Sequence, residues 1–231
     1  FQLGTFCNID QSNKTVTLAP LLDELGHTIL PERTVRYDHL VIAIGSVSND
    51  FNTPGIKDHC YFLDSNQQAE RFQHSLLDSF TRLHQDDNQQ QSLNIAIVGG
   101  GATGVELSAE LYHVSELLKL YGLTNMSSKR LHIHLIEAGP RILPALPERI
   151  AVSAKRELLK LGVNVLEQTQ VKEATEQGFI TKDEEHINAD IMVWAAGVKA
   201  PDFIKDLGVF ELTRSNQIQV NKFLQSTVDE S

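Results

Sequence analysis

Three glycines in the segment VGGGATG have the spacing that lets a phosphate group approach a polypeptide backbone. Gly99, Gly101 and Gly104 form the pattern G-x-G-x-x-G directly after an apolar run and directly before a helical pattern. In this context the first glycine permits a tight turn, the second admits a pyrophosphate, and the third allows close packing of helix on strand. The segment therefore predicts a dinucleotide site; the alternative is a turn that needs glycine only for packing.

The start of the following helix is expected to complete the phosphate contacts. The first N–H groups of a helix have no partner within it, and they face a bound anion together with the positive end of the helix dipole. We therefore predict cofactor contacts from the turn and from the first helical residues. These residues are Gly99, Gly100, Gly101, Ala102, Thr103 and Gly104.

An acidic residue stands where a dinucleotide fold needs one. Glu137 ends the apolar segment LHIHLIE, and a carboxylate at the end of the second strand accepts hydrogen bonds from the adenosine ribose hydroxyls. It lies further along than the usual distance of about 20 residues, because a longer helix and loop intervene. A carboxylate here repels a 2′-phosphate, so we expect NADH to be preferred over NADPH. The alternative is a solvated glutamate at a strand end.

The elements around the glycine turn alternate between strands and helices, which predicts a parallel sheet with right-handed crossovers. Residues 170–188 change to short strands with a turn at Gly178, as in an antiparallel meander. The expected fold is a Rossmann-like, three-layer α/β domain with a β-meander. The expected strands are 95–98, 131–137, 163–169 and 189–197, and the expected helices are 64–84, 103–120 and 147–162.

Two further segments, RYDHLVIAIGS and ADIMVWAAGVK, share one design on either side of the glycine turn. Each has an acid, an apolar run, and then Ala-x-Gly. We expect residues 37–46, like 189–197, to form a buried strand that ends at a glycine. A glycine at the carboxyl end of such a strand lets a ligand meet the backbone there.

Composition excludes several other classes of protein. The chain has 231 residues with a formal net charge of −10, which argues against a nucleic-acid binder. No apolar run approaches the roughly 18–20 residues that span a bilayer. Cys7 and Cys60 stand alone, and His132 and His134 lack a third ligand nearby, so neither a redox dithiol nor a metal site is predicted. Both ends look cut, and we expect an internal fragment of a longer protein.

Four motifs together carry a resemblance to a known family. YDHLVIAIGS…FNTPGI, IAIVGGGATGVELSAEL, LIEAGPRILPALP and MVWAAGVKAPDF occur in this order. The set resembles the flavoprotein reductases in which an NAD(P)H domain is inserted into an FAD domain. More closely, it is similar to type II NADH dehydrogenase, the non-proton-pumping NADH:quinone oxidoreductase of the respiratory chain, and the likeness covers essentially the whole chain.

The resemblance implies a domain plan and further cofactor contacts. Residues 1–52 and 206–231 would belong to the FAD domain, and 53–205 would form the NADH domain, with a connector and helix at 53–92 and a core at 93–205. The family's first glycine hexad, its later Gly-Asp motif and its carboxy-terminal amphipathic region are absent from this chain. The implied contacts are Ala43, Ile44 and Gly45 with FAD, and Ala196, Gly197 and Val198 beside the nicotinamide.

The helix after the glycine turn carries the candidate catalytic residue. Glu106 and Glu110 are four residues apart and so share a face. In the family that the chain resembles, a glutamate of the segment GVE lies near the nicotinamide, so Glu106 is predicted to position the ring or accept protons. The alternative for Glu106 is a helix-capping acid, and we expect Glu110 to be a surface residue. Trp194 is expected in the core.

The resemblance thus implies an FAD-dependent oxidoreductase that takes electrons from NADH to a quinone. It also implies peripheral attachment to the cytoplasmic side of the inner membrane by regions outside this chain, and it leaves a homodimer open. By itself the chain is expected to be soluble and nearly inactive. The alternatives are a sulfide:quinone or ferredoxin-type reductase and a non-catalytic dinucleotide-binding module. A disulfide reductase is disfavoured because no cysteine pair is present.

Overall fold

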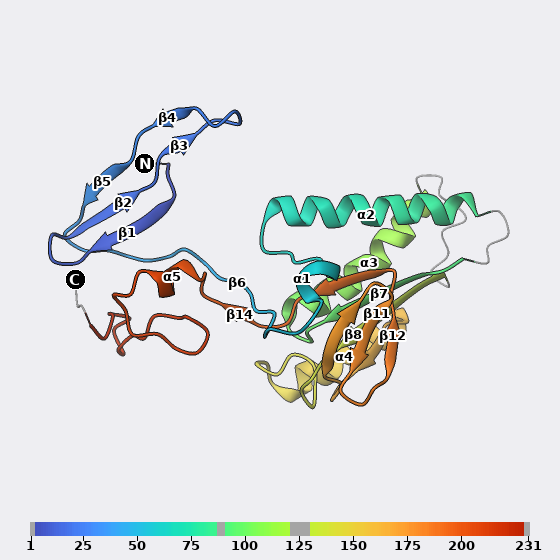
Figure 1. The fold of residues 1–231 in the computed structure, drawn as a ribbon. Coiled ribbons are helices and arrows are strands. Elements are labelled where there is room, and N and C mark those ends of the chain that lie inside the picture. Colours follow the sequence, from blue (N-terminus) through green and yellow to red (C-terminus); the bar gives the residue numbers. More distant parts are fainter. Residues whose placement is uncertain (1–2, 87–90, 121–129, 229–231) are drawn as a thin grey trace. The chain divides into compact units, whose positions relative to one another are not determined.

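The computed structural model describes residues 3–86, 91–120 and 130–228, and it divides into two compact units (Figure 1). One unit comprises Phe1–Val47 with Val198–Ser231, and the other comprises Ser48–Gly197. The domain boundaries predicted from the resemblance lie at 52/53 and 205/206. They remain a prediction, since compactness alone does not assign a nucleotide to a unit.

A four-stranded parallel sheet forms the centre of the unit Ser48–Gly197. The strand order is β13 (Ile191–Trp194), β7 (Leu93–Val98), β8 (Leu131–Ile136) and β9 (Asn164–Leu166), and each neighbouring pair is parallel. All four are apolar along most of their length, as is typical of strands covered on both faces. The predicted parallel sheet is confirmed.

Three helices cover one face of this sheet. They are α2 (Asn66–Gln85), α3 (Ala102–Leu120) and α4 (Glu148–Leu161). Ile95 and Ile97 of β7 point to this side and pack in one apolar cluster with Phe80 of α2 and Leu111 of α3. The Ser65 hydroxyl oxygen caps α2 by accepting from the Gln68 N–H. Alternation along the strand therefore assigns one set of side chains to the helical layer.

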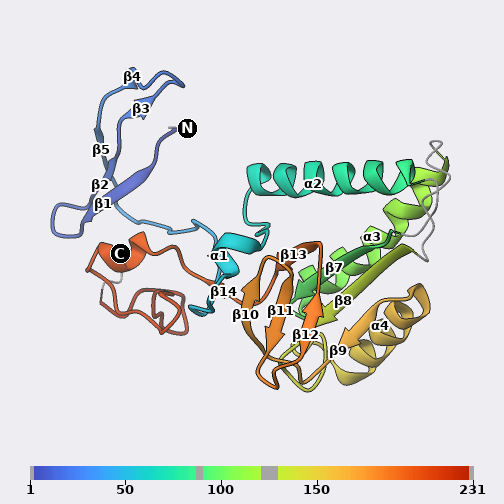
Figure 2. The ribbon, with the colours of Figure 1, turned by 45° about the vertical axis from the view of Figure 1, so that its right-hand side comes forward.

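A β-meander covers the opposite face (Figure 2). It consists of β10 (Val171–Thr175), β11 (Gly178–Thr181) and β12 (His186–Asn188), each antiparallel to the next, with the short helix α1 (Ile56–His59) beside it. Ala96 and Val98 of β7 point to this side and pack with Phe179 and Ile187 of the meander. Helices, parallel sheet and meander make three layers, so the expected three-layer α/β fold with its meander is confirmed.

The other unit is built mainly from antiparallel strands. β1 (Phe6–Asp10), β2 (Thr15–Leu18) and β5 (Arg33–Arg36) form one sheet, and β3 (Leu21–Leu22) pairs with β4 (Thr28–Leu30). A short helix, α5 (Phe203–Asp206), completes it. Two short strands, β6 (Val47–Ser48) and β14 (Val198–Lys199), lie where the chain passes from one unit to the other.

The prediction of a buried strand at 37–46 is wrong. The chain leaves its sheet after β5 and runs without regular structure to β6, and the Val41 side chain is 85% exposed. An apolar run becomes a buried strand only when other strands pair with its N–H and C=O groups. In the part of the chain that the structure describes, no strand pairs with this segment. The matching prediction at 189–197 is confirmed by β13.

Arg130 holds the end of α2 against the start of the sheet. Its guanidinium donates to the carbonyl oxygens of Leu83 and Gln91, at 2.9 and 2.8 Å, and to the Asp86 carboxylate at 2.7 Å. The Arg130 residue is 5% exposed. A buried charge is tolerated because its donors are satisfied in this way.

We expect Arg130→Ala to lower the free energy of unfolding by about 3–5 kcal/mol, because it leaves Asp86 partly buried without its cation. Urea denaturation followed by circular dichroism measures the loss. Arg156→Ala is the control, since the Arg156 side chain is 67% exposed, and a change within about 0.5 kcal/mol is expected. Equal effects of the two substitutions would contradict this account of Arg130.

Candidate dinucleotide site

Close backbone packing explains two of the glycines in the turn. Gly99 has a φ of +118°, and a Cβ on it would lie 2.6 Å from the Ala195 carbonyl group. A Cβ on Gly104 would lie 2.0 Å from the Gly99 carbonyl oxygen. No side chain fits at either position, so the first turn of α3 lies directly against the end of β7.

Gly101 differs from these two. Apart from Gly101 itself and its two neighbours in the chain, no protein atom lies within 4 Å of the position that its Cβ would occupy. The residue is exposed beside the equally exposed Ala102 and Thr103 at the start of α3. The fold therefore does not require glycine here. Open space at a glycine beside free helix-start N–H groups fits the close approach of a pyrophosphate to the backbone.

The Glu137 carboxylate is bonded to the glycine turn. One oxygen accepts from the Gly100 N–H at 2.7 Å, and the other accepts from the Gly139 N–H at 2.6 Å. A Cβ on Gly100 would lie 2.9 Å from the Cβ of Glu137. The hexad pattern leaves position 100 unspecified, and this contact explains why a fourth glycine is present there.

A cavity of about 450 Å³ lies at the carboxyl ends of β7, β8 and β13. It brings together five predicted site residues: Gly99, Gly101, Glu137, Ala196 and Gly197. Sequence reasoning did not assign its other walls, which come from the bend before α1, the loops after β8 and β9, and the end of β13. These walls are Phe51, Thr53, Val98, Ile136, Ala138, Pro144, Thr169, Gln170, Val171, Trp194 and Ala195.

Other predicted residues lie elsewhere. Glu106 is exposed on α3 and is not among the residues that line this cavity. Val198 belongs to the other unit, where its side chain is 59% exposed. In that unit Ala43, Ile44 and Gly45 help to line a separate, largely apolar cavity of about 730 Å³.

Neither of the two units contains a pair of cysteines. Burial raises the pKa of the Cys60 thiol to about 12, so the thiol stays protonated at neutral pH and is a poor nucleophile. Cys7 is exposed and lies in the other unit. Among residues 3–86, 91–120 and 130–228, no three His, Cys, Asp or Glu side chains gather as a metal site would need.

A three-layer α/β fold with a glycine turn, a strand-end acid and a cavity beside them defines the class of dinucleotide-binding folds. Comparison with known families agrees with this class. The model of the pyridine nucleotide-disulphide oxidoreductase family matches residues 2–230. The chain belongs to this family.

Comparison with individual proteins shows which members of this family the chain resembles. The type II NADH:quinone oxidoreductase of Haemophilus influenzae is 46% identical over 245 aligned positions, which cover 100% of this chain and 55% of the relative. An external alternative NAD(P)H-ubiquinone oxidoreductase B1, mitochondrial, of Solanum tuberosum is 31% identical over 211 positions, with 86% and 36% covered. The similarity to type II NADH dehydrogenases that the motifs indicated is confirmed, and the chain spans about half the length or less of these relatives.

Among solved structures, NDH2 of Plasmodium falciparum in complex with NADH superposes with a TM-score of 0.73. The two sequences are 22% identical, and the match covers 87% of this chain and 42% of that one. At this identity the likeness bears on the fold alone.

Two substitutions test which glycines of the turn the fold needs for close packing and which it does not. We expect Gly104→Ala to destabilise the chain by about 3 kcal/mol or more, because its methyl group would overlap the Gly99 carbonyl. Gly101→Ala should leave stability unchanged or raise it by up to about 1 kcal/mol, because an alanine fits there and restricts the unfolded chain. Urea denaturation measures both. A large loss of stability in Gly101→Ala would show that the fold does need this glycine.

Proposed function

We propose that this chain is the NADH-binding part of an FAD-dependent type II NADH:quinone oxidoreductase. The observation that carries the proposal is that Gly101, a glycine for which the fold has no use, opens on the same cavity as Glu137. The 46% identity to the Haemophilus enzyme supports the particular reaction.

In this proposal the chain holds NADH through backbone groups and one carboxylate. The pyrophosphate lies against the turn and the N–H groups of Ala102 and Thr103. Glu137 accepts hydrogen bonds from the adenosine ribose hydroxyls, and its own orientation is fixed by the Gly100 and Gly139 N–H groups. Two backbone donors hold the carboxylate at the turn, so it meets the ribose without rearranging.

The nicotinamide half is assigned to Ala196, Gly197 and Val198, with Glu106 as the proposed catalytic residue. The chemistry that bound FAD supplies is acceptance of a hydride from NADH and delivery of electrons to a quinone. Ala43, Ile44 and Gly45 line an apolar cavity, but the described residues of their unit include no second glycine-rich strand–turn–helix for an FAD pyrophosphate. FAD binding is therefore proposed for the whole protein and not for this chain alone.

The raised pKa of the Cys60 thiol, about 12, supports a quinone over a disulfide as electron acceptor, because a protonated thiol is a poor nucleophile. Within the described ranges no helix is both long and apolar enough to cross a membrane. We propose that the whole protein attaches peripherally to the cytoplasmic side of the inner membrane through regions outside this chain. Similarity to the family supports this statement and leaves a homodimer open.

Discrimination between NADH and NADPH tests the role of Glu137. The single tryptophan, Trp194, lines the cavity, so its fluorescence reports binding. We expect NADH to bind at least about tenfold more tightly than NADPH, a difference of about 1.4 kcal/mol. Glu137→Gln should remove most of this preference, because the neutral amide no longer repels a 2′-phosphate.

Glu148→Gln, an exposed acid at the start of α4, is the control and should leave the preference intact. Equal binding of NADH and NADPH by the unsubstituted chain would rule out the proposed role of Glu137. Binding of neither nucleotide would overturn the assignment of the site itself.

Glu106 is tested in the whole protein loaded with FAD. We expect Glu106→Gln to lower kcat for NADH-dependent quinone reduction by about 100-fold, the size of a typical proton-transfer or positioning contribution. Glu110→Gln, one helical turn further on the same face, should keep kcat within about twofold. Similar rates for both variants would contradict a catalytic role of Glu106. Absence of quinone reduction in the unsubstituted protein would favour the alternative of a non-catalytic dinucleotide-binding module.

A further inference from the structure

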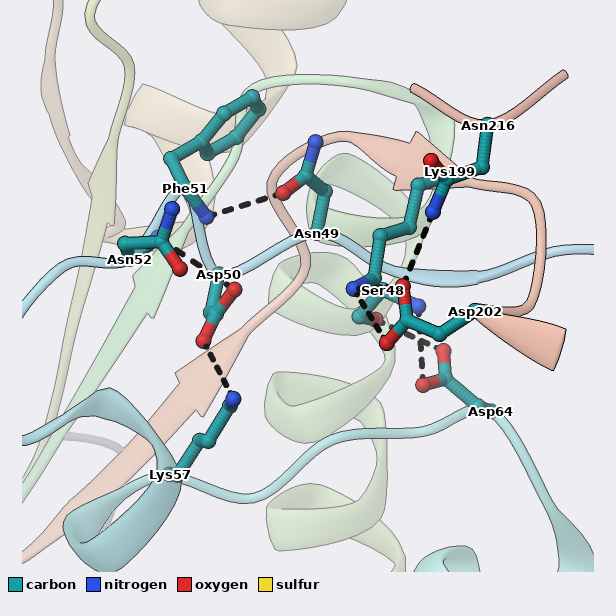
Figure 3. Close-up of polar contacts among 10 residues, drawn as sticks. All are labelled: Ser48, Asn49, Asp50, Phe51, Asn52, Lys57, Asp64, Lys199, Asp202 and Asn216. Carbon is teal, nitrogen blue, oxygen red and sulfur yellow. Dashed lines mark hydrogen bonds and ion pairs between the residues drawn. The ribbon is translucent and has the colours of Figure 1, made fainter. Parts of the chain in front are cut away.

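The bend formed by residues 49–52 is fastened to the end of β13 beside the cavity. The Trp194 indole N–H donates to the Asn49 carbonyl oxygen at 2.9 Å, and the Asn49 N–H donates to the Gly197 carbonyl oxygen at 3.3 Å. The Asn49 side-chain oxygen in turn accepts from the Phe51 N–H at 3.0 Å (Figure 3). The bend therefore has a fixed position relative to the carboxyl end of this strand.

Asp50 holds the same bend from within. It is 7% exposed, and its carboxylate pairs with the Lys57 ammonium at 3.2 Å (Figure 3). The Asn52 N–H points to the same carboxylate at 3.4 Å, and the Thr53 N–H donates to the Asp50 carbonyl oxygen at 2.9 Å. Side chains on both flanks thus impose the backbone path at Phe51.

The backbone at Phe51 is strained. Phe51 and Asn52 have φ values of +52° and +55°, and this left-handed region is unfavourable for a residue with a large side chain. Such a conformation persists only where its surroundings impose it, and it concentrates at ligand sites. The bend does not bury the phenyl ring, because Phe51 is 60% exposed. The strain presents an apolar ring at the surface and adds no buried core contact.

The ring lies against Gly197, where a Cβ would come within 2.5 Å of its Cζ atom, and it lines the 450 Å³ cavity together with Gly101 and Glu137. Along the edge of the sheet, Glu137 directly follows β8, the glycine turn directly follows β7, and Gly197 lies three residues after the end of β13. A dinucleotide with its adenosine ribose at β8 and its pyrophosphate at β7 must extend its other half toward β13. Phe51 stands at that end.

We propose that Phe51 is a positioning residue for the nicotinamide half of NADH and packs its ring against the nicotinamide ring. This inference rests on the proposed function, because it assumes that a dinucleotide occupies the cavity. An aromatic ring offers a large, rigid apolar contact without a hydrogen bond that would fix one redox state of the nicotinamide. Gly197 has no side chain, so the phenyl ring and the ligand share the space above it.

Binding of two ligands by the whole protein loaded with FAD tests the proposal. NAD⁺ contains the nicotinamide, and ADP-ribose has the same adenosine, pyrophosphate and second ribose without it. We expect Phe51→Ala to weaken NAD⁺ binding about five- to tenfold by isothermal titration calorimetry, the range of an aromatic contact. Binding of ADP-ribose should stay within about twofold, and Phe51→Tyr should bind both ligands as the unsubstituted protein does.

A second variant separates positioning from folding. Glycine adopts a φ of +52° without strain, so Phe51→Gly should keep or raise the melting temperature while it weakens NAD⁺ as Phe51→Ala does. Val152→Ala, at an exposed apolar side chain of α4, is the control and should change neither affinity. Equal weakening of NAD⁺ and ADP-ribose, or unchanged NAD⁺ affinity in Phe51→Ala, would overturn the inference while NADH binding stands. If the unsubstituted protein bound neither ligand, the proposed function and this inference would both fall.

Discussion

The carbonyl oxygen of Gly99 lies so close to Gly104 that a methyl group on Gly104 would come within 2.0 Å of it. This backbone contact seats the first turn of α3 on the end of β7, and it sets the direction in which the first N–H groups of the helix point. The parallel register pairs Val98 with Ile136, so the residues that follow these two leave the sheet side by side. The bond from the Gly100 N–H to the Glu137 carboxylate is a consequence of that register.

The glycine turn and Glu137 therefore depend on each other structurally. An extra side chain at position 100 would press on Glu137, and a shorter acid at 137 would leave the Gly100 and Gly139 N–H groups without their acceptor. Removing an acceptor from partly buried donors costs more than the bond itself contributes. This interdependence fixes the acid and the turn relative to each other, and a fixed site favours binding because less order is lost on association.

Sequence patterns predicted those parts of the molecule that depend on neighbours in the chain. Apolar runs, their alternation with helices and the glycine spacing are local, and they gave the parallel sheet, the helices around α3 and the position of Glu137. Phe51 was missed because the bend that carries it is held by the bond from Trp194 to Asn49, which are 145 residues apart, and because composition does not reveal a left-handed bend. Residues 37–46 were misassigned for the converse reason: an apolar run says nothing about whether strands are present to pair with it.

The residue types that line the cavity bear on the proposed mechanism. Its walls are mainly glycine, alanine, apolar side chains and two threonines, and Glu137 is the one carboxylate that faces it within the described residues. That carboxylate accepts hydrogen bonds from two backbone donors, the N–H groups of Gly100 and Gly139. In the proposed function, a site of this composition contributes the orientation of NADH that hydride transfer needs from a protein. The placement of the proposed nicotinamide then depends on the end of β13, where Gly197 and the strained bend at Phe51 meet.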